Sequence, residues 1–315
     1  MRHNISDSIS PGARFFNAGR MQERKLLKMY IDMHTHIFPD ALARRAIENL
    51  ERIADEGSGR KGSLKACTDG TYNGLIDSMK RCGIDASLIL PVMTKPSQFD
   101  TVNRYAAEIN GKNGIYSFGG MHPDCENVEE KLDFIKSLGL KGIKLHPDYQ
   151  RCAVDDERYL KIVRHCLKLG LYVTFHAGYD IGYPEPMYCR PDVFRSAYMS
   201  LLQEFEEEKH PHIILAHLGG VTTAEKTMKY LCGLPIYLDL AFTFGVMREE
   251  DIAEIIRLHG AQKILFASDS PWSDQGRSRV GLEALPISAE EKELISHKNA
   301  EKILGVVHSV CEAAR

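Results

Sequence analysis

Apolar stretches alternate with amphipathic stretches along most of this sequence. Eight short runs are almost continuously apolar, and a segment with helical spacing of its apolar residues follows each of them. Apolar strands separated by helices are typical of a parallel sheet that is covered on both faces. The predicted strands are 30–33, 86–92, 115–120, 140–145, 171–175, 212–216, 235–240 and 263–268. The predicted helices are 40–52, 71–82, 100–110, 126–138, 156–169, 192–208, 222–232, 249–259 and 289–304.

Eight strand–helix units predict an α/β fold, a (β/α)₈ TIM barrel, as a single domain over residues 29–308. Residues 55–74 interrupt the pattern after the first strand because they are rich in Gly, Lys, Ser and Thr. We expect an insertion there, which leaves from the catalytic face and influences substrate choice. Arg60, Lys61 and Lys65 could draw an anionic substrate inward. An ordinary solvated loop is the alternative.

Residues 1–28 are polar, contain Pro11-Gly12 and lack the apolar core of a secretory signal. We expect a flexible N-terminal extension. The chain has a net charge of −3 and a pI near 6.5, so it lacks the excess of positive charge that is typical of proteins that bind nucleic acid or an anionic membrane. No apolar run approaches the roughly 20 residues that span a bilayer. The 8 cysteines are scattered without a C-x-x-C motif, which favours a reduced, cytoplasmic protein.

Histidines gather at the predicted strand ends, where a barrel carries its chemistry. His34 and His36 follow the first strand and point to the same face, since side chains two apart share a face in an extended chain. Single histidines follow four further strands, and Asp269 follows the last. Neutral imidazole is a common ligand of first-row divalent ions, so the pattern predicts a metal site. The four further histidines are His122, His146, His176 and His217.

Four motifs carry a resemblance to a known family: I-D-M-H-T-H-I-F-P at the first strand, T-F-H-A-G, L-A-H-L-G-G and A-S-D-S-P-W. In this order they resemble the amidohydrolase superfamily, over about residues 31–304. The sequence is most similar to its amidohydrolase-related (amidohydrolase 2) branch, which includes proteins like aminocarboxymuconate semialdehyde decarboxylase. The resemblance implies a divalent ion, with zinc favoured, held by His34, His36, His176 and Asp269. It also implies a catalytic role for His217.

The chemistry of these side chains agrees with that assignment. Three neutral imidazoles and one carboxylate leave a position open for water or substrate. A divalent ion lowers the pKa of bound water to near 7. Asp269 could take the proton of that water and return it to a leaving group, and His217 could polarise a substrate oxygen. We expect His122 and His146 in the wall of the substrate pocket.

Lys144 leaves two interpretations open. Alternation in G-I-K-L-H-P points Lys144 into the barrel, where an unpaired ammonium is unfavourable. K-L-H-P resembles the K-L-Y-P of dihydroorotase-type members, whose lysine is carbamylated and bridges two metals. In that case His176 and His217 would serve a second ion. The favoured alternative is an unmodified Lys144 beside one ion, which binds a substrate carboxylate or pairs with an acidic residue.

These observations predict a metal-dependent hydrolase that acts on a small carboxylated or cyclic substrate through metal-activated water. A non-oxidative decarboxylase (carboxy-lyase) on the same scaffold is the alternative. A TatD-like nuclease is a more distant alternative. It requires an acidic ligand where this chain has Lys144, and it requires a basic groove, which the net charge of −3 does not favour. We expect a small-molecule substrate, no nucleic-acid or membrane partner, and allow for a homodimer.

Overall fold

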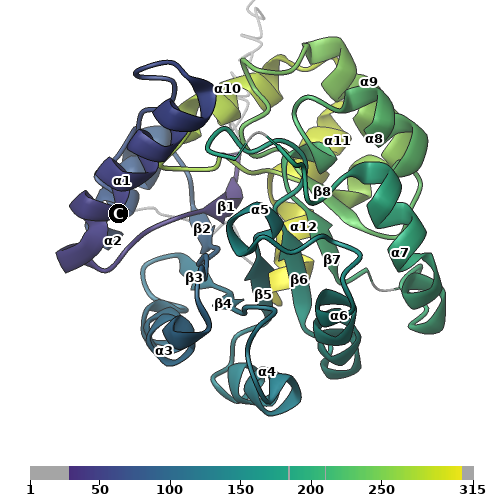
Figure 1. The fold of residues 1–315 in the computed structure, drawn as a ribbon. Coiled ribbons are helices and arrows are strands. Elements are labelled where there is room, and N and C mark those ends of the chain that lie inside the picture. Colours follow the sequence, from purple (N-terminus) through teal and green to yellow (C-terminus); the bar gives the residue numbers. More distant parts are fainter. Residues whose placement is uncertain (1–27, 184, 210, 307–315) are drawn as a thin grey trace, which may run out of the picture.

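The computed structural model describes residues 28–183, 185–209 and 211–306, and a ring of parallel strands lies at its centre with helices around it (Figure 1). Within these residues there are nine strands, all of them short and most of their residues buried. Their bounds are β1 (Ile31–Thr35), β2 (Ala86–Ile89), β3 (Ile115–Ser117), β4 (Gly119–Gly120), β5 (Gly142–Leu145), β6 (Tyr172–Phe175), β7 (Ile213–Leu215), β8 (Tyr237–Asp239) and β9 (Ile264–Leu265).

The strands form one barrel in sequence order. Ladders join β1-β2-β3 and β4-β5-β6-β7-β8-β9, and every pairing is parallel. The predicted strand 115–120 is divided into β3 and β4 at Phe118, whose N–H donates to the carbonyl of Ile89. The ring closes where Met33 N donates to Phe266 O and Asp269 N donates to His34 O, each at 2.9 Å. The predicted (β/α)₈ barrel is confirmed.

Side-chain alternation along the strands separates two apolar layers. Ile31, Leu88 and Phe118 belong to a smaller buried cluster that also contains residues of β7, β8 and β9. Ile143 and Leu145 of β5 instead belong to the larger cluster, which also contains residues of the surrounding helices. Lys144, between these two residues, therefore points into the barrel, as its sequence position predicts.

The α-helices are α1 (Asp40–Ser58), α2 (Tyr72–Cys82), α3 (Phe99–Ile109), α4 (Val128–Ser137), α5 (Pro147–Gln150), α6 (Glu157–Leu169), α7 (Pro191–Glu204), α8 (Ala224–Tyr230), α9 (Glu249–His259), α10 (Gln275–Ala284), α11 (Ala289–Glu293) and α12 (Asn299–Leu304). The predicted helix 289–304 is continuous in space but changes to π-helical geometry over Leu294–Lys298. Two helices, α5 and α10, were not predicted. The α10 segment has few apolar residues and contains two glycines, so its sequence gives a weak helical pattern.

The prediction that residues 55–74 are irregular is wrong at its beginning. Asp55–Ser58 continue α1, and the helix ends at Gly59, which has a left-handed φ of 66°. This conformation favours glycine, which explains why the helix stops there and not at Gly57. The irregular segment is thus Gly59–Thr71.

Several sequence predictions concern residues outside the described part of the chain. The predicted extension lies there except for Lys28, which pairs with Glu283. Residues 307 and 308 of the predicted domain lie there as well. Among the described residues no helix has the length and apolarity that crossing a membrane requires. The seven described cysteines are free thiols.

Candidate active site

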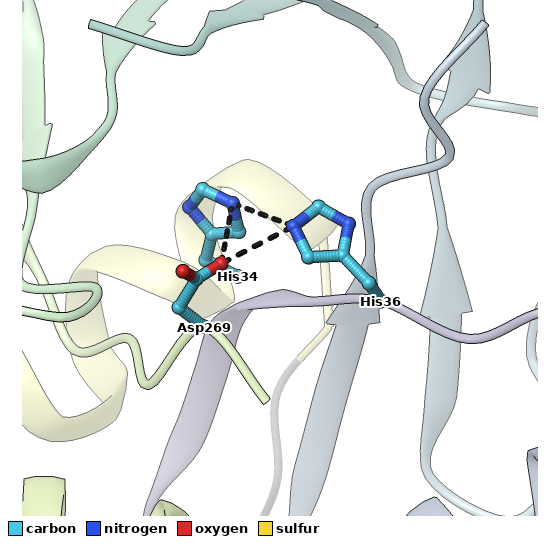
Figure 2. Close-up of side chains that lie close together, drawn as sticks. All are labelled: His34, His36 and Asp269. Carbon is cyan, nitrogen blue, oxygen red and sulfur yellow. Dashed lines mark hydrogen bonds and ion pairs between the residues drawn. The ribbon is translucent and has the colours of Figure 1, made fainter. Parts of the chain in front are cut away.

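His34, His36 and Asp269 converge where β1 and the segment after β9 meet (Figure 2). His34 Nε2 lies 3.2 Å from His36 Nε2 and 3.4 Å from Asp269 Oδ1. His36 Nε2 lies 3.2 Å from the same carboxylate oxygen. Ligands about 2.1 Å from one tetrahedral ion are separated by about 3.4 Å, so these three atoms have the spacing of a shared metal site.

Hydrogen bonds at Nδ1, on the side of each ring away from the site, orient both imidazoles. His36 Nδ1 donates to the carbonyl of Leu90 at 2.7 Å, which leaves Nε2 with a free electron pair that faces the site. His34 Nδ1 lies 2.8 Å from Asp239 Oδ2, and both side chains are buried. Such outer hydrogen bonds select the tautomer that binds a metal. Burial, with the nearby Lys144 charge, lowers the pKa of His34 well below its usual value, so the ring is neutral.

Asp269 holds its carboxylate in the site through an unusual backbone conformation. Its φ is 75°, in the left-handed region that aspartate tolerates better than most residues. Burial raises the pKa of Asp269, but the hydrogen bond with His36 and the nearby His34 and His217 outweigh burial, and the net pKa is lowered. The carboxylate is therefore ionised at neutral pH.

His176 and His217 contact each other beside this group. His217 Nδ1 donates to the carbonyl of Ala241 at 2.9 Å, and His217 Nε2 lies 3.1 Å from His176 Nδ1. The other nitrogen of His176, Nε2, faces Asp148 and Asp180. His176 therefore groups more closely with His146 and Asp180 than with His34, His36 and Asp269.

His176 and three groups near it have shifted pKa values because they are buried. Burial lowers the pKa of His146 and of His176 well below the usual value. It raises the pKa of Asp180 to about 6, and burial together with the Asp180 charge raises that of Asp148 to about 7. The described residues around these two carboxylates thus offer little compensating positive charge.

Lys144 is 1% exposed, and its Nζ lies 3.3 Å from His34 Nε2. Burial lowers its pKa to about 8, although the carboxylates of Asp239 and Asp269 oppose the shift. Lys144 is the only lysine or arginine among the residues that line the cavity above the site. It is consequently the cationic side chain that a substrate carboxylate would meet in this cavity.

The cavity has a volume of about 320 Å³ and mostly apolar walls. Its lining includes Leu50 and Ala54 of α1, Leu64 of the following segment, and Trp272. Arg60, Lys61 and Lys65 are not lining residues, and Lys65 pairs with Glu51 at 2.5 Å. His146 lines the cavity, whereas His122 does not: its Nδ1 accepts from Asp124 N at 3.2 Å.

Sequence reasoning missed three carboxylates of this region: Asp148, Asp180 and Asp239. Asp239 ends the otherwise apolar run of β8, and its burial in a strand was a signal that it has a structural partner. Asp148 follows His146 in H-P-D, directly after β5. Asp180 lies in the loop after β6, four residues beyond His176, where nothing in the local pattern marks it.

Comparison with known proteins agrees with the fold. The amidohydrolase family model matches residues 31–306. No curated protein matches the chain. An uncharacterised TIM-barrel protein from Bordetella bronchiseptica is 17% identical, with a TM-score of 0.69, covering 88% of this chain and 98% of that one.

Two further solved structures are similar in fold. A 5-carboxyvanillate decarboxylase from Novosphingobium aromaticivorans with bound manganese is 16% identical, with a TM-score of 0.62 and coverage of 90% of this chain and 98% of that one. A putative 2-pyrone-4,6-dicarboxylic acid hydrolase from Pseudomonas putida is 15% identical, with a TM-score of 0.57 and coverage of 88% and 97%. The family match extends over nearly the whole barrel. The chain therefore belongs to the amidohydrolase family of metal-dependent enzymes.

Proposed function

We propose that the protein is a metal-dependent hydrolase of a small carboxylated or cyclic substrate. The observation that carries the proposal is the ionised Asp269 carboxylate within 3.4 Å of both His34 Nε2 and His36 Nε2, all three residues lining the cavity. A carboxylate in this position can bind an ion and also accept a proton from water.

The donor set of this group suits a first-row divalent ion. It combines two imidazoles of selected tautomer with one carboxylate, and such ligands favour zinc, manganese or iron over calcium. Zinc is our first choice from the family resemblance, and manganese is the alternative, since the solved decarboxylase contains it. The ion would supply Lewis-acid polarisation and a lowered pKa of water.

The surrounding side chains have separate roles in this proposal. Asp269 takes the proton of the attacking water and returns it to the leaving group. His217 is fixed through Nδ1 by the carbonyl of Ala241, and its Nε2, which lies 3.1 Å from His176 Nδ1 in the substrate-free protein, accepts from a substrate hydroxyl when the substrate binds. Lys144 binds a substrate carboxylate, and His146 forms part of the cavity wall.

Decarboxylation is the second candidate, and the apolar cavity walls favour it. Ile37, Phe38 and Trp272 can pack on a flat ring while Lys144 binds its carboxylate. An apolar environment destabilises a carboxylate and so favours cleavage of its C–C bond to neutral carbon dioxide. The electron pair stays on the ring carbon, which then takes a proton derived from solvent. The similar decarboxylase structure adds to this candidate only by analogy of fold.

One experiment separates the two reactions. The protein, loaded with zinc or manganese, is assayed on a panel of carboxylated lactones, cyclic amides and hydroxybenzoates. Hydrolysis incorporates ¹⁸O from labelled water into the product, whereas decarboxylation releases carbon dioxide and incorporates solvent deuterium at carbon. Asp269→Asn should abolish either activity. Activity that survives both Asp269→Asn and complete removal of metal would contradict the proposal.

A further inference from the structure

We infer that the substrate carries an amide group, separate from the bond that reacts, and that His146 Nε2 and Asp180 Oδ2 bind this group. Both side chains line the cavity, and they come from the segments that follow β5 and β6. The inference deepens the proposed function, on which it rests for the identity of the cavity as the substrate site. The metal centre keeps its predicted ligands.

A backbone contact determines which nitrogen of His146 carries the proton. His146 Nδ1 accepts a long hydrogen bond from Tyr149 N, at 3.4 Å, at the beginning of α5. A neutral imidazole has one donor and one acceptor nitrogen, so Nε2 is the donor. His146 Nε2 lies 3.8 Å from Asp180 Oδ2, which is too far for a hydrogen bond. Among the described residues, this N–H is therefore a donor without an acceptor.

Asp180 offers the complementary acceptor. Its Oδ1 accepts from Gly182 N at 2.8 Å and from Tyr183 N at 3.2 Å, which fixes the carboxylate. Within the described part of the chain nothing donates to Oδ2, which lies 3.8 Å from His146 Nε2 and 3.9 Å from His176 Nε2. The side chain is 8% exposed. A ligand that donates to this buried oxygen gains a charge-assisted hydrogen bond that the free protein lacks.

The separation of the two atoms fits the edge of an amide. The oxygen and nitrogen of a primary or cyclic amide are about 2.3 Å apart and point the same way. Two nearly parallel hydrogen bonds can therefore run from this edge to atoms 3.8 Å apart, with the carbonyl facing His146 and the N–H facing Asp180. A hydroxyl oxygen would have to serve both atoms at an angle of about 85°, which is narrower than its hydrogen-bond geometry prefers.

The signs of the two partners exclude the other common groups. A carboxylate has no proton for Asp180 Oδ2 and would bring a second negative charge next to it. An ammonium could donate to Asp180, but it would place its charge against the N–H of His146. A ketone satisfies His146 alone and leaves the buried carboxylate oxygen without a donor. An amide is the group that satisfies both.

Ring stacking holds the His146 donor beside the reaction centre. The His146 ring stacks on Tyr149, with centroids 3.9 Å apart, and on His176, with centroids 4.1 Å apart and planes 9° apart. These contacts fix the direction of the Nε2–H bond. His176 is a predicted metal ligand, so a substrate whose amide binds here has its reacting group next to the metal centre.

The test measures binding and does not depend on turnover. The full chain, loaded with Zn²⁺, is titrated with two matched pairs of probes by ligand-observed NMR, which measures weak binding. One pair is benzamide and acetophenone, and the other is 3-carbamoylbenzoate and 3-acetylbenzoate. Each pair differs only in whether the group can donate. We expect the wild type to bind each amide about 10-fold more tightly than its ketone.

Asp180→Asn is the main variant. Its amide oxygen can keep the Gly182 and Tyr183 hydrogen bonds, so a donor takes the place of Oδ2 and the preference for the amide should disappear. His146→Phe keeps a ring that can stack on His176 but removes the donor. It should weaken the binding of amide and ketone alike and leave their ratio unchanged. Thermal unfolding verifies that each variant is folded.

Asp69→Asn is the matched control, because Asp69 also accepts a turn hydrogen bond through Oδ1 but is exposed and does not line the cavity. It should keep the wild-type preference. Equal binding of amide and ketone by the wild type, or an unchanged preference in folded Asp180→Asn, would overturn the subsite. Wild-type affinities in His146→Phe would overturn the role of its donor.

Lys144→Met separates this inference from the proposed function. The proposed function predicts that this variant weakens binding of the two benzoates and leaves that of benzamide unchanged. Wild-type affinity for the benzoates in Lys144→Met would contradict the proposed role of Lys144, while a preference for benzamide over acetophenone would still support the subsite. Benzoates that need Lys144 but show no preference for the amide would overturn the subsite alone.

Discussion

The carboxylate of Asp239 lies 2.8 Å from Nδ1 of His34, and both side chains are 1% exposed. The other oxygen of Asp239 accepts from His217 N at 2.8 Å and from Ala241 N at 3.1 Å. A single buried side chain from β8 therefore connects one proposed metal ligand with the backbone of the proposed catalytic histidine. Its position makes Asp239 a positioning residue for both.

Asp239→Asn should weaken metal binding without unfolding the protein. The amide oxygen can keep the two backbone hydrogen bonds, but the amide N–H₂ cannot accept from His34 Nδ1, so the metal-binding tautomer is no longer selected. We expect a loss of about 10- to 100-fold in metal affinity, measured by competition with a coloured chelator. Asp85→Asn is the control: Asp85 lies just before β2, and its carboxylate accepts a hydrogen bond from Tyr30 N. This variant should bind metal as the wild type does. Equal affinity in both variants would contradict the role of Asp239.

Lys144→Met should stabilise the metal-free protein and abolish catalysis. The folded state holds the pKa of Lys144 at about 8, compared with 10.5 in the unfolded chain. Between these values the unfolded state binds more protons, so the free energy of unfolding rises with pH from 8 to 10.5. As pH falls from 10.5 to 8 this contribution is lost, and below pH 8 the full cost of the buried charge is present. At pH 7 the buried charge costs about 3 kcal/mol. Urea unfolding at pH 7 and pH 10 measures this difference, and a variant that keeps the wild-type pH slope would exclude the explanation.

Gly57→Ala tests whether helix propensity or tertiary packing decides the stability of the end of α1. In an isolated helix alanine is more favourable than glycine by about 1 kcal/mol. In this fold, however, a Cβ at Gly57 would lie 2.5 Å from the carbonyl oxygen of Ile181 and 2.6 Å from that of Gly182. We expect a net destabilisation of about 1–3 kcal/mol, together with weaker substrate binding, because the displaced loop carries Asp180.

The control for this prediction lies one residue further along the same helix. Ser58→Ala changes an exposed residue whose hydroxyl forms only long hydrogen bonds: it donates to Asp55 O at 3.4 Å and to Arg60 O at 3.3 Å, and accepts from Arg60 N at 3.3 Å. Its melting temperature and KM should stay close to those of the wild type. An increase in melting temperature for Gly57→Ala would show that helix propensity prevails over the contact with residues 181 and 182.

His259 should make the protein sensitive to mild acid. Burial, with the charge of Lys263, lowers the pKa of His259 from 6.5 to about 4, and its Nε2 donates to Ile236 O at 2.8 Å. Between these pKa values the unfolded chain binds the extra proton, so this contribution to stability is complete above pH 6.5 and is lost as pH falls towards 4. From pH 7 to pH 5 it amounts to about 2 kcal/mol.

His259→Gln can keep the hydrogen bond to Ile236 but has no titrating group. Urea unfolding of chelator-treated protein at pH 7 and pH 5 should therefore show a smaller loss of stability for the variant than for the wild type. The other acidic groups titrate in both proteins, so the difference between the two losses isolates His259. Parallel losses would show that this histidine is protonated in the folded state.

The sequence by itself determined the barrel and the strand ends at which chemistry could occur. Apolar runs separated by helical segments leave few alternatives to a parallel sheet covered on both faces, because each unit has an apolar face to bury. The H-T-H pair and Asp269 could be assigned to neighbouring strand ends for the same reason. Lys144 could be pointed inward because side chains alternate along a strand.

Only the tertiary structure decided how these side chains pair. Asp239 contacts His34 across 205 residues of sequence, and His176 divides its two nitrogens between His217 and the carboxylates of Asp148 and Asp180. Neither relation has a local sequence signal, because ring orientation depends on partners from several strands and loops. The end of α1 is a similar case: its polar last turns resemble a loop in the sequence, yet Gly57 packs against the backbone of residues 181 and 182. A pattern along one segment shows which face is buried, whereas the contacts of that face depend on every segment packed against it.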